Sequence, residues 1–168
     1  MYDTVTGNRP LRDHRQHRGM LAEFVRRSRY FMVCGAKFNR PKETGDQSEL
    51  GYRYFEGAAG GAIMVGTKIT APTFSELFDW QDPIVVVDAS GDDIADRIDE
   101  LDADPDRRAA MRRRNASGSL RAHDPAHRWR TVLATLGLEE PPGVDQRIRR
   151  LAQRADEVDF SEIERHAR

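Results

Sequence analysis

The sequence predicts an α/β fold, a partial Rossmann-like domain with a short parallel sheet and a helical C-terminal region. Three short apolar runs alternate with segments that have helical spacing, which is typical of a parallel sheet covered on both faces. A complete doubly wound domain has five or six strands. We therefore interpret the chain as starting part-way through a larger fold, with one lobe over 1–138 and a linker and charged helix over 139–168.

The first half of the chain alternates between helix and strand signals. Met20, Leu21, Phe24 and Val25 recur at helical spacing, and the apolar run YFMVCG that follows is typical of a buried strand. The expected order is helix 13–28, strand 30–35, loop 36–48, helix 49–61, strand 62–66, turn 73–78 and strand 83–88.

The second half is expected to be helical. Ser90 is placed to cap a first helix, and Asp104-Pro105 is typical of a cap followed by a first-turn proline, opening a helix to about Ser117. Asp124-Pro125 repeats that signature before a helix that Gly137 stops. A charged helix over 144–166 completes the chain.

Composition excludes several classes of protein. The 168 residues carry a formal net charge of −1, so no global field favours nucleic acid, and any attraction for phosphate must be local. The single cysteine, Cys34, indicates a reducing compartment and is expected to be a buried strand thiol. We find no integral membrane segment and expect a cytoplasmic protein.

The loop over 36–48 is basic and precedes a helix. A helix start offers free N–H groups and the positive end of a dipole, so cations beside it suit a diphosphate. The candidate phosphate ligands of this loop are Lys37, Arg40, Lys42 and the hydroxyl of Thr44.

The helix that follows carries polar residues at spacings of four, three and four. They are Glu49, Arg53, Glu56 and Gly60, which such spacing places on one helix face. A carboxylate one or two turns from a phosphate site can accept two hydrogen bonds from a ribose diol, and Gly57 and Gly60 would keep that face low enough for a ligand. The alternative is an ordinary exposed ladder of ion pairs.

The stretch over 27–66 resembles the donor site of glycosyltransferases with two Rossmann-like lobes (the GT-B fold), in the group-1 branch of CgeB/YkvP-like enzymes. The motif R-x-F-E-x-x-A-x-G is matched by Arg53 to Gly61 before the strand AIMVG. An E-L-F turn, a D-P-x-x-R helix start at Asp104 and a histidine-containing turn in RAHDPAHRWRTVL (121–133) follow in the family's order.

The resemblance implies a hexosyltransferase-like enzyme that transfers a sugar from a nucleoside-diphosphate sugar to an acceptor hydroxyl. It implies that Glu56 holds the donor ribose and that Arg53 faces the diphosphate, while Gly60 and Gly61 permit the turn into the next strand. The resemblance implies that no cofactor is needed beyond the donor substrate, since in this fold the helix end and basic side chains commonly stabilise the diphosphate without a bound metal. Its acceptor-binding first lobe is not represented here, so we expect a second lobe or partner chain to supply it; the acceptor itself stays open.

Two other functions remain open at this stage. The fold could persist as a non-catalytic remnant or interaction module. Alternatively, the arginine-rich helix over 105–121 could bind RNA or lipid, although nearby aspartates favour a solvated pair of helices joined by ion pairs.

Metal sites are disfavoured by the sequence. His14 and His17 have no third ligand near them, and Asp104-Pro105-Asp106 is better explained by capping than by metal binding. We expect one of His123 and His127 to bond a backbone carbonyl, and Trp80 and Trp129 to be packing residues, although Trp80 could also border a ligand.

Overall fold

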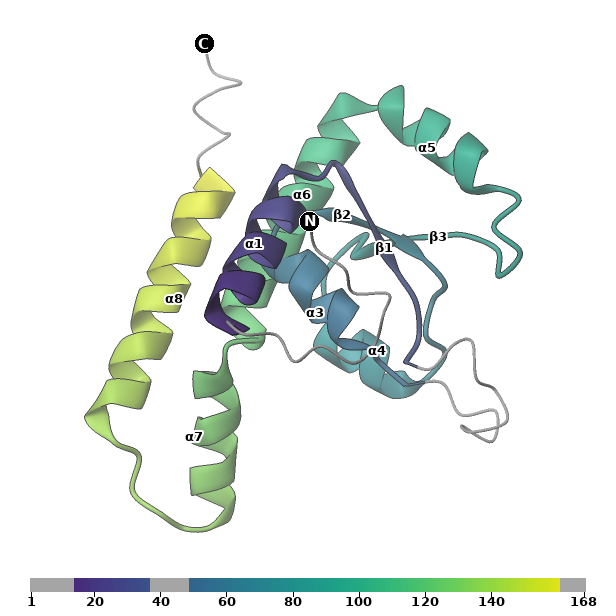
Figure 1. Cartoon of the computed structure of the whole chain (residues 1–168). Helices are drawn as coiled ribbons and strands as arrows, with labels where there is room; N and C mark the ends of the chain where they lie inside the picture. Colours follow the sequence, from purple (N-terminus) through teal and green to yellow (C-terminus); the bar gives the residue numbers. More distant parts are fainter. Residues whose placement is uncertain (1–13, 37–48, 161–168) are drawn as a thin grey trace.

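The elements follow one another in the predicted order. The computed structural model describes residues 14–36 and 49–160 (Figure 1). The helices are α1 (His14–Arg27), α3 (Tyr52–Ala59), α4 (Pro72–Leu77), α5 (Ile94–Asp102), α6 (Pro105–Ala122), α7 (Pro125–Thr135) and α8 (Pro142–Phe160). The strands are β1 (Tyr30–Val33), β2 (Ile63–Gly66) and β3 (Ile84–Val86). The predicted α/β class is confirmed.

The three strands form one parallel sheet in the order β1-β2-β3. All four residues of the central strand β2 are buried, as its continuous apolar sequence predicts. Gly66 pairs with Val33, and a Cβ on Gly66 would lie 1.8 Å from the carbonyl oxygen of Val33. The two backbones approach so closely here that only glycine fits. The sheet is a short, partial Rossmann-like arrangement.

Each face of the sheet has its own apolar cluster. On one face Tyr54 and Ala58 of α3 pack with Phe74, Phe78 and Met64. The hydroxyl of Tyr54 donates to the carbonyl oxygen of Thr67 at 2.7 Å, and burial raises the pKa of this phenol to about 12. The hydroxyl therefore stays protonated and remains a donor at any physiological pH.

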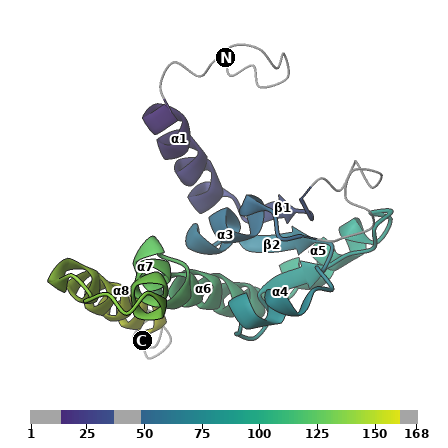
Figure 2. The same ribbon diagram turned by 90° about the horizontal axis from the view of Figure 1, so that it is seen from below.

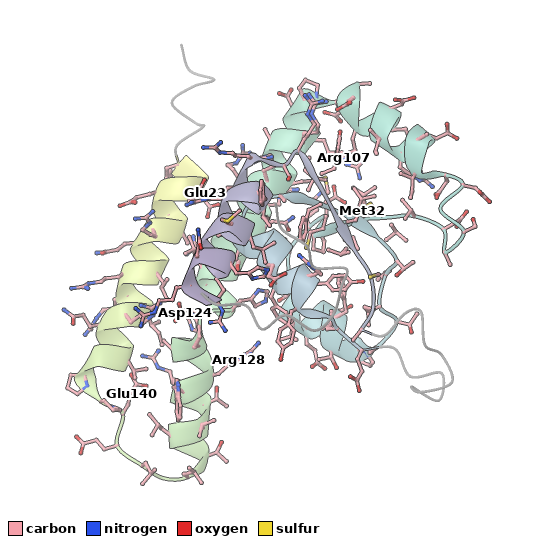
Figure 3. The ribbon with its side chains drawn as sticks, viewed as in Figure 1. Glu23, Met32, Arg107, Asp124, Arg128 and Glu140 are labelled. Atoms are coloured by element: carbon pink, nitrogen blue, oxygen red, sulfur yellow. The ribbon has the colours of Figure 1, made fainter. Side chains whose placement is uncertain are left out.

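On the opposite face, Leu101 of α5 and Met111 of α6 pack against Ile63 and Val65. Met32, labelled in Figure 3, alternates along β1 with Phe31 and Val33 of the α3 face, so it lies on this side of the strand, and it remains 56% exposed. This face is therefore less completely covered than the α3 face.

Helix α6 is bound to the sheet by a buried asparagine. The Asn115 side chain donates to the carbonyl oxygen of Ala62 at 2.9 Å and accepts from the indole nitrogen of Trp80 at 2.8 Å. Asn115 is fully buried with both ends of its amide satisfied. The prediction of a solvated helical pair over this region was therefore wrong for α6, although Arg108 does form the expected ion pair with Asp102 of α5 at 2.8 Å.

Several helix boundaries differ from prediction. Helix α3 begins at Tyr52, after Gly51 in an extended conformation. Helix α5 begins at Ile94 rather than after Ser90, because turns occupy the intervening residues. Helix α6 runs on to Ala122, since it is packed between the sheet and α8.

The predicted aspartate caps of α6 and α7 are confirmed. The carboxylate of Asp104 accepts from the backbone N–H of Arg107, and that of Asp124 accepts from Ala126, both at 2.9 Å. Asp124 lies at the start of α7, and Glu140 lies just before the start of α8 (Figure 3). Gly137 follows α7 with a φ of 65°, the left-handed conformation that glycine adopts readily.

Helices α7 and α8 form an arm on the far side of α6 from the sheet (Figure 1). The predicted packing role of Trp129 was wrong, because this side chain is 59% exposed. Val132 and Leu136 share its helix face and are also exposed, so this apolar stripe does not contribute to the core.

Candidate functional site

The start of α3 lies beside the carboxyl end of β1. The backbone N–H of Ala36 donates to the carbonyl oxygen of Glu49 at 2.9 Å, which draws the chain before α3 against the chain after β1. A Cβ on Gly51 would lie 3.2 Å from the carbonyl oxygen of Cys34, so Gly51 permits this approach. The first turn of α3 therefore faces the sheet edge at which parallel α/β folds bind ligands.

Arg53 and Glu56 form an ion pair on the exposed side of α3, with 3.5 Å between the guanidinium and the carboxylate. The guanidinium carbon of Arg53 also lies 5.7 Å from the centre of the Phe31 ring. The two side chains are 53% and 37% exposed, so an incoming ligand can reach both of them. An exposed pair of this kind adds little to stability.

Glu56 lines a pocket of about 580 Å³ between α1 and α3. Its walls are apolar where Leu21 and Val25 face Ala59, and its polar groups are Glu56, Arg18 and Arg26. Tyr52 adds an exposed aromatic ring. Figure 2 shows α1 next to α3, the two helices that form the walls. The volume and the few convergent polar groups suit a small organic ligand.

Glu56 also borders a second pocket, of about 350 Å³, between α3 and the end of α6. Its lining includes Phe55, Ser119 and His123. The His123 ring lies edge-on to the rings of Phe55 and Phe78, with centroids 5.0 and 4.8 Å away. Glu56 is therefore the one acidic side chain that the two described pockets share.

His123 is fixed by one ring nitrogen. Its Nε2 lies 2.7 Å from the carbonyl oxygen of Leu77, so Nε2 carries the proton and donates. Its Nδ1 is buried without a partner among the described residues. Burial lowers the pKa of His123, so the ring is neutral at pH 7. The expected histidine–carbonyl bond is confirmed, and His127 makes a longer one of 3.3 Å to Leu120.

The comparisons with known proteins bear on this site. A family model described as glycosyl transferase-like matches residues 3–134, which is well over half of the chain. The chain belongs to the glycosyl transferase-like family. Neither the search of curated proteins nor the search of solved structures found a match. Membership in the family indicates a transferase that moves a sugar from a nucleotide-sugar donor to an acceptor.

Within this glycosyl transferase-like chain, the predicted site residues have different outcomes. The basic-loop candidates Lys37, Arg40, Lys42 and Thr44 lie outside the described residues. Glu49 is exposed and precedes α3, so it does not share a helix face with Arg53 and Glu56 as predicted.

The glycines mainly serve packing. A Cβ on Gly57 would lie 2.9 Å from Met64 and Phe31, so Gly57 faces the sheet rather than a ligand. A Cβ on Gly60 would lie 2.4 Å from Val25, which lets α1 pack closely on α3. Gly61, with a φ of 63°, makes the turn into β2 as predicted.

Sequence reasoning missed the part that α1 plays in this pocket. Arg18, Leu21 and Val25 recur at spacings of three and four, so they fall on one helix face, and Arg26 borders that face. The predicted apolar stripe of this helix instead included Phe24, which is 63% exposed. Tyr52, exposed at the start of α3, was also missed.

The described residues form neither a metal site nor a membrane-spanning helix. Over 14–36 and 49–160, no group of three His, Cys, Asp or Glu side chains is placed to hold a metal ion. No helix in the same ranges is long and apolar enough to cross a membrane. Cys34 is a free, half-buried thiol just beyond β1 rather than a buried strand residue.

Proposed function

We propose that this chain is the donor-binding part of a hexosyltransferase of the two-lobed GT-B fold, in the CgeB/YkvP-like branch. Its task would be to hold a nucleoside-diphosphate sugar while an acceptor hydroxyl attacks the anomeric carbon. A bond forms between the acceptor oxygen and that carbon, the glycosyl–phosphate bond breaks, and the nucleoside diphosphate leaves. The acceptor's proton passes to a base or to solvent.

The observation that carries the proposal is the position of Glu56. This carboxylate lies on the second turn of α3, partly exposed, in a pocket that also contains two arginines and an exposed tyrosine. A carboxylate can accept two hydrogen bonds from a ribose diol, whose orientation it then fixes.

The other groups of the pocket fit the remaining parts of a nucleotide. Arg18 and Arg26 line the pocket from α1, and a guanidinium matches the geometry of phosphate oxygens. Arg26 is paired with Glu23, and a phosphate would compete for it. The ring of Tyr52 offers a surface on which a base can stack.

Arg53 supports the same assignment from the neighbouring turn of α3. Its guanidinium is held between Phe31 and Glu56, close to the helix start. The leaving diphosphate gathers negative charge in the transition state, so cations and helix N–H groups fixed there would lower the barrier. Lys37, Arg40, Lys42 and Thr44 are the further candidates for this contact, on the segment before α3.

The test is a calorimetric titration of the chain with UDP and GDP. Replacing Glu56 by Gln is expected to weaken nucleotide binding by about 1–3 kcal/mol, the scale for a lost charged hydrogen bond. Glu157→Gln, a matched change on the exposed surface of α8, should leave binding unchanged. Uridine and guanosine without phosphates would separate the ribose contact from the phosphate contact.

Two outcomes would contradict the proposal. Equal losses in Glu56→Gln and Glu157→Gln would mean that only net charge matters. Absence of any heat at millimolar nucleotide would instead favour the alternative, a non-catalytic module that keeps the fold.

A further inference from the structure

Four arginines gather at the opposite edge of the sheet from the α3 start. Arg27 and Arg29 flank the turn from α1 into β1, while Arg108 and Arg112 lie one turn apart on α6. Together with Ile63, Pro105 and Ala109 they line a pocket of about 380 Å³, which we call the arginine pocket. Its charged lining residues are all cationic.

One carboxylate positions two of these arginines. Asp102 accepts from Arg29 at 3.0 Å and from Arg108 at 2.8 Å, and the hydroxyl of Tyr30 donates to the same oxygen at 2.6 Å. Hydrogen bonding from Tyr30 lowers the pKa of Asp102, with the arginines adding to the effect, so the carboxylate stays ionised. A single negative charge is therefore shared by two guanidinium groups.

Arg112 is held by groups that do not neutralise it. Its two terminal nitrogens donate to the carbonyl oxygens of Ser28 at 3.1 Å and Arg26 at 3.3 Å. These carbonyls belong to the end of α1, where a cation is favoured by the helix dipole. The contact fixes the guanidinium without giving it an anionic partner.

Arg27 is the most exposed member of the arginine pocket. Its nearest carboxylate is Glu23 at 3.7 Å, which is also paired with Arg26, and the Arg27 side chain is 84% exposed. The nearby carboxylate of Asp104 is directed to the backbone N–H of Arg107 as a helix cap. Within the part of the chain that the structure describes, the four cations thus exceed the carboxylates that face them.

These contacts also tie α1, β1, α5 and α6 together, and such a structural role accounts for part of the cluster. These contacts leave some N–H donors of the arginines unused, however. A guanidinium carries five N–H bonds, and the contacts of Arg112 and Arg108 occupy only some of them. Fixed, incompletely neutralised guanidinium groups around a cavity are the arrangement that binds a tetrahedral oxyanion.

We infer that the arginine pocket binds a phosphate group, separately from the nucleotide pocket of α3. The ligand is either a free phosphate or diphosphate or the headgroup of an anionic phospholipid, since both present the same oxygens. The arginine pocket lies at the amino ends of the strands, whereas Arg53 and the start of α3 lie near their carboxyl ends. The arginine pocket and the pocket of Glu56 share no lining residue, although Arg27 of the first follows Arg26 of the second in the chain. Phosphate binding in the arginine pocket does not depend on the donor proposal.

The test is a titration of the whole chain with inorganic phosphate and pyrophosphate at constant ionic strength, followed by calorimetry. The exposed pair Arg27→Gln with Arg29→Gln should weaken binding about ten- to a hundredfold, the scale for losing one charged hydrogen bond or more. The matched control is Arg150→Gln with Arg154→Gln on the exposed side of α8, which removes the same charge and should change nothing.

Arg53→Gln separates this site from the donor pocket. Phosphate binding that survives Arg53→Gln but not the Arg27/Arg29 pair supports the inference. Loss in Arg53→Gln alone, equal loss in the α8 control, or no binding of either anion would overturn it. Circular dichroism of each variant would show whether the fold is retained; if the Arg27/Arg29 pair unfolds, Arg27→Gln alone replaces it, because this side chain is almost fully exposed.

Vesicles distinguish the source of the phosphate. Co-sedimentation with phosphatidylglycerol vesicles but not with phosphatidylcholine vesicles, reversed by added pyrophosphate, would identify a headgroup site. Binding of pyrophosphate without sedimentation would identify a soluble ligand.

Discussion

Around β2 the chain is stabilised by buried apolar side chains, whereas the α7–α8 arm is held largely by charged ones. Tyr54, Met64 and Met111 are fully buried in the sheet region. In the arm, the pairs of Arg130 with Asp145 and of Arg147 with Asp124 join the helices, while Trp129 is exposed to solvent. Both regions carry aromatic residues on amphipathic helices. In the sheet region, Tyr54 of α3 is covered by the core, whereas in the arm no described element covers the stripe that contains Trp129.

Because their stabilising contacts differ, the two regions should respond differently to mutation and to salt. Exposed ion pairs are screened by salt, whereas the burial of apolar area involves no charges to be screened. The candidate nucleotide pocket belongs to the first region, since its walls are α1 and α3. Three substitutions test this contrast, and they follow in order of decreasing change in stability.

Tyr54→Ala should have the largest effect. It removes a fully buried ring that contacts Phe74 and Phe78 with centroids 5.8 and 6.3 Å away, and it removes the hydrogen bond to Thr67. Such a change costs about 3–5 kcal/mol in the free energy of unfolding. Urea denaturation followed by circular dichroism would measure it. Trp129→Ala is the matched change in the arm and should stay within about 0.5 kcal/mol; a loss above that would show that Trp129 is covered in solution.

Asp124→Ala should have an intermediate effect. It removes the cap of α7 and both hydrogen bonds from Arg147, each of 2.8 Å, and should cost about 1–2 kcal/mol, mainly through the cap. Asp124→Asn keeps a capping oxygen and should cost less, as seen in the same denaturation assay. If the two variants were equally unstable, the charge rather than the cap would dominate.

The pH dependence of this site has a definite sign. Hydrogen bonding from Arg147 is the main cause that lowers the pKa of Asp124. The resulting stabilisation is complete above the ordinary aspartate pKa of about 3.9 and is lost as the pH falls through the lowered value. In Asp124→Ala, this part of the acid sensitivity should be absent.

Arg130→Gln should have the smallest effect. Its guanidinium lies 2.7 Å from Glu140 and 3.0 Å from Asp145, but the side chain is 40% exposed. Pairs of this kind contribute about 0.2–1 kcal/mol. The thermal midpoints of wild type and variant should converge as sodium chloride is raised, and a gap that persisted at high salt would show that the pair is effectively buried.

Features that depend on neighbouring residues could be predicted from the sequence. The caps at Asp104 and Asp124 act on N–H groups two or three residues away, so the letters alone locate them. The three strands follow from continuous apolar runs, and the turn at Gly61 from the glycine itself. The helix signal around it likewise predicts that Glu56 lies on α3. Its role in binding the donor stays a prediction.

Features that depend on distant residues could not be predicted. Periodicity groups Trp129 with Val132 and Leu136, but it does not say whether another element covers them. Asn115 is buried because Trp80 and Ala62, far from it in the chain, satisfy its amide. The part of the candidate site that α1 supplies likewise depends on how α1 crosses α3.

The packing of α8 against α6 has a practical consequence for expression. The family match stops at residue 134, yet Arg121 of α6 donates to Asp156 and Asp159 of α8. A protein that ends at the family boundary would lack α8, so Arg121 would lose both carboxylate partners. The side of α6 that packs against α8, where Ala155 is buried, would be exposed to solvent. Recombinant forms should therefore extend at least through Phe160.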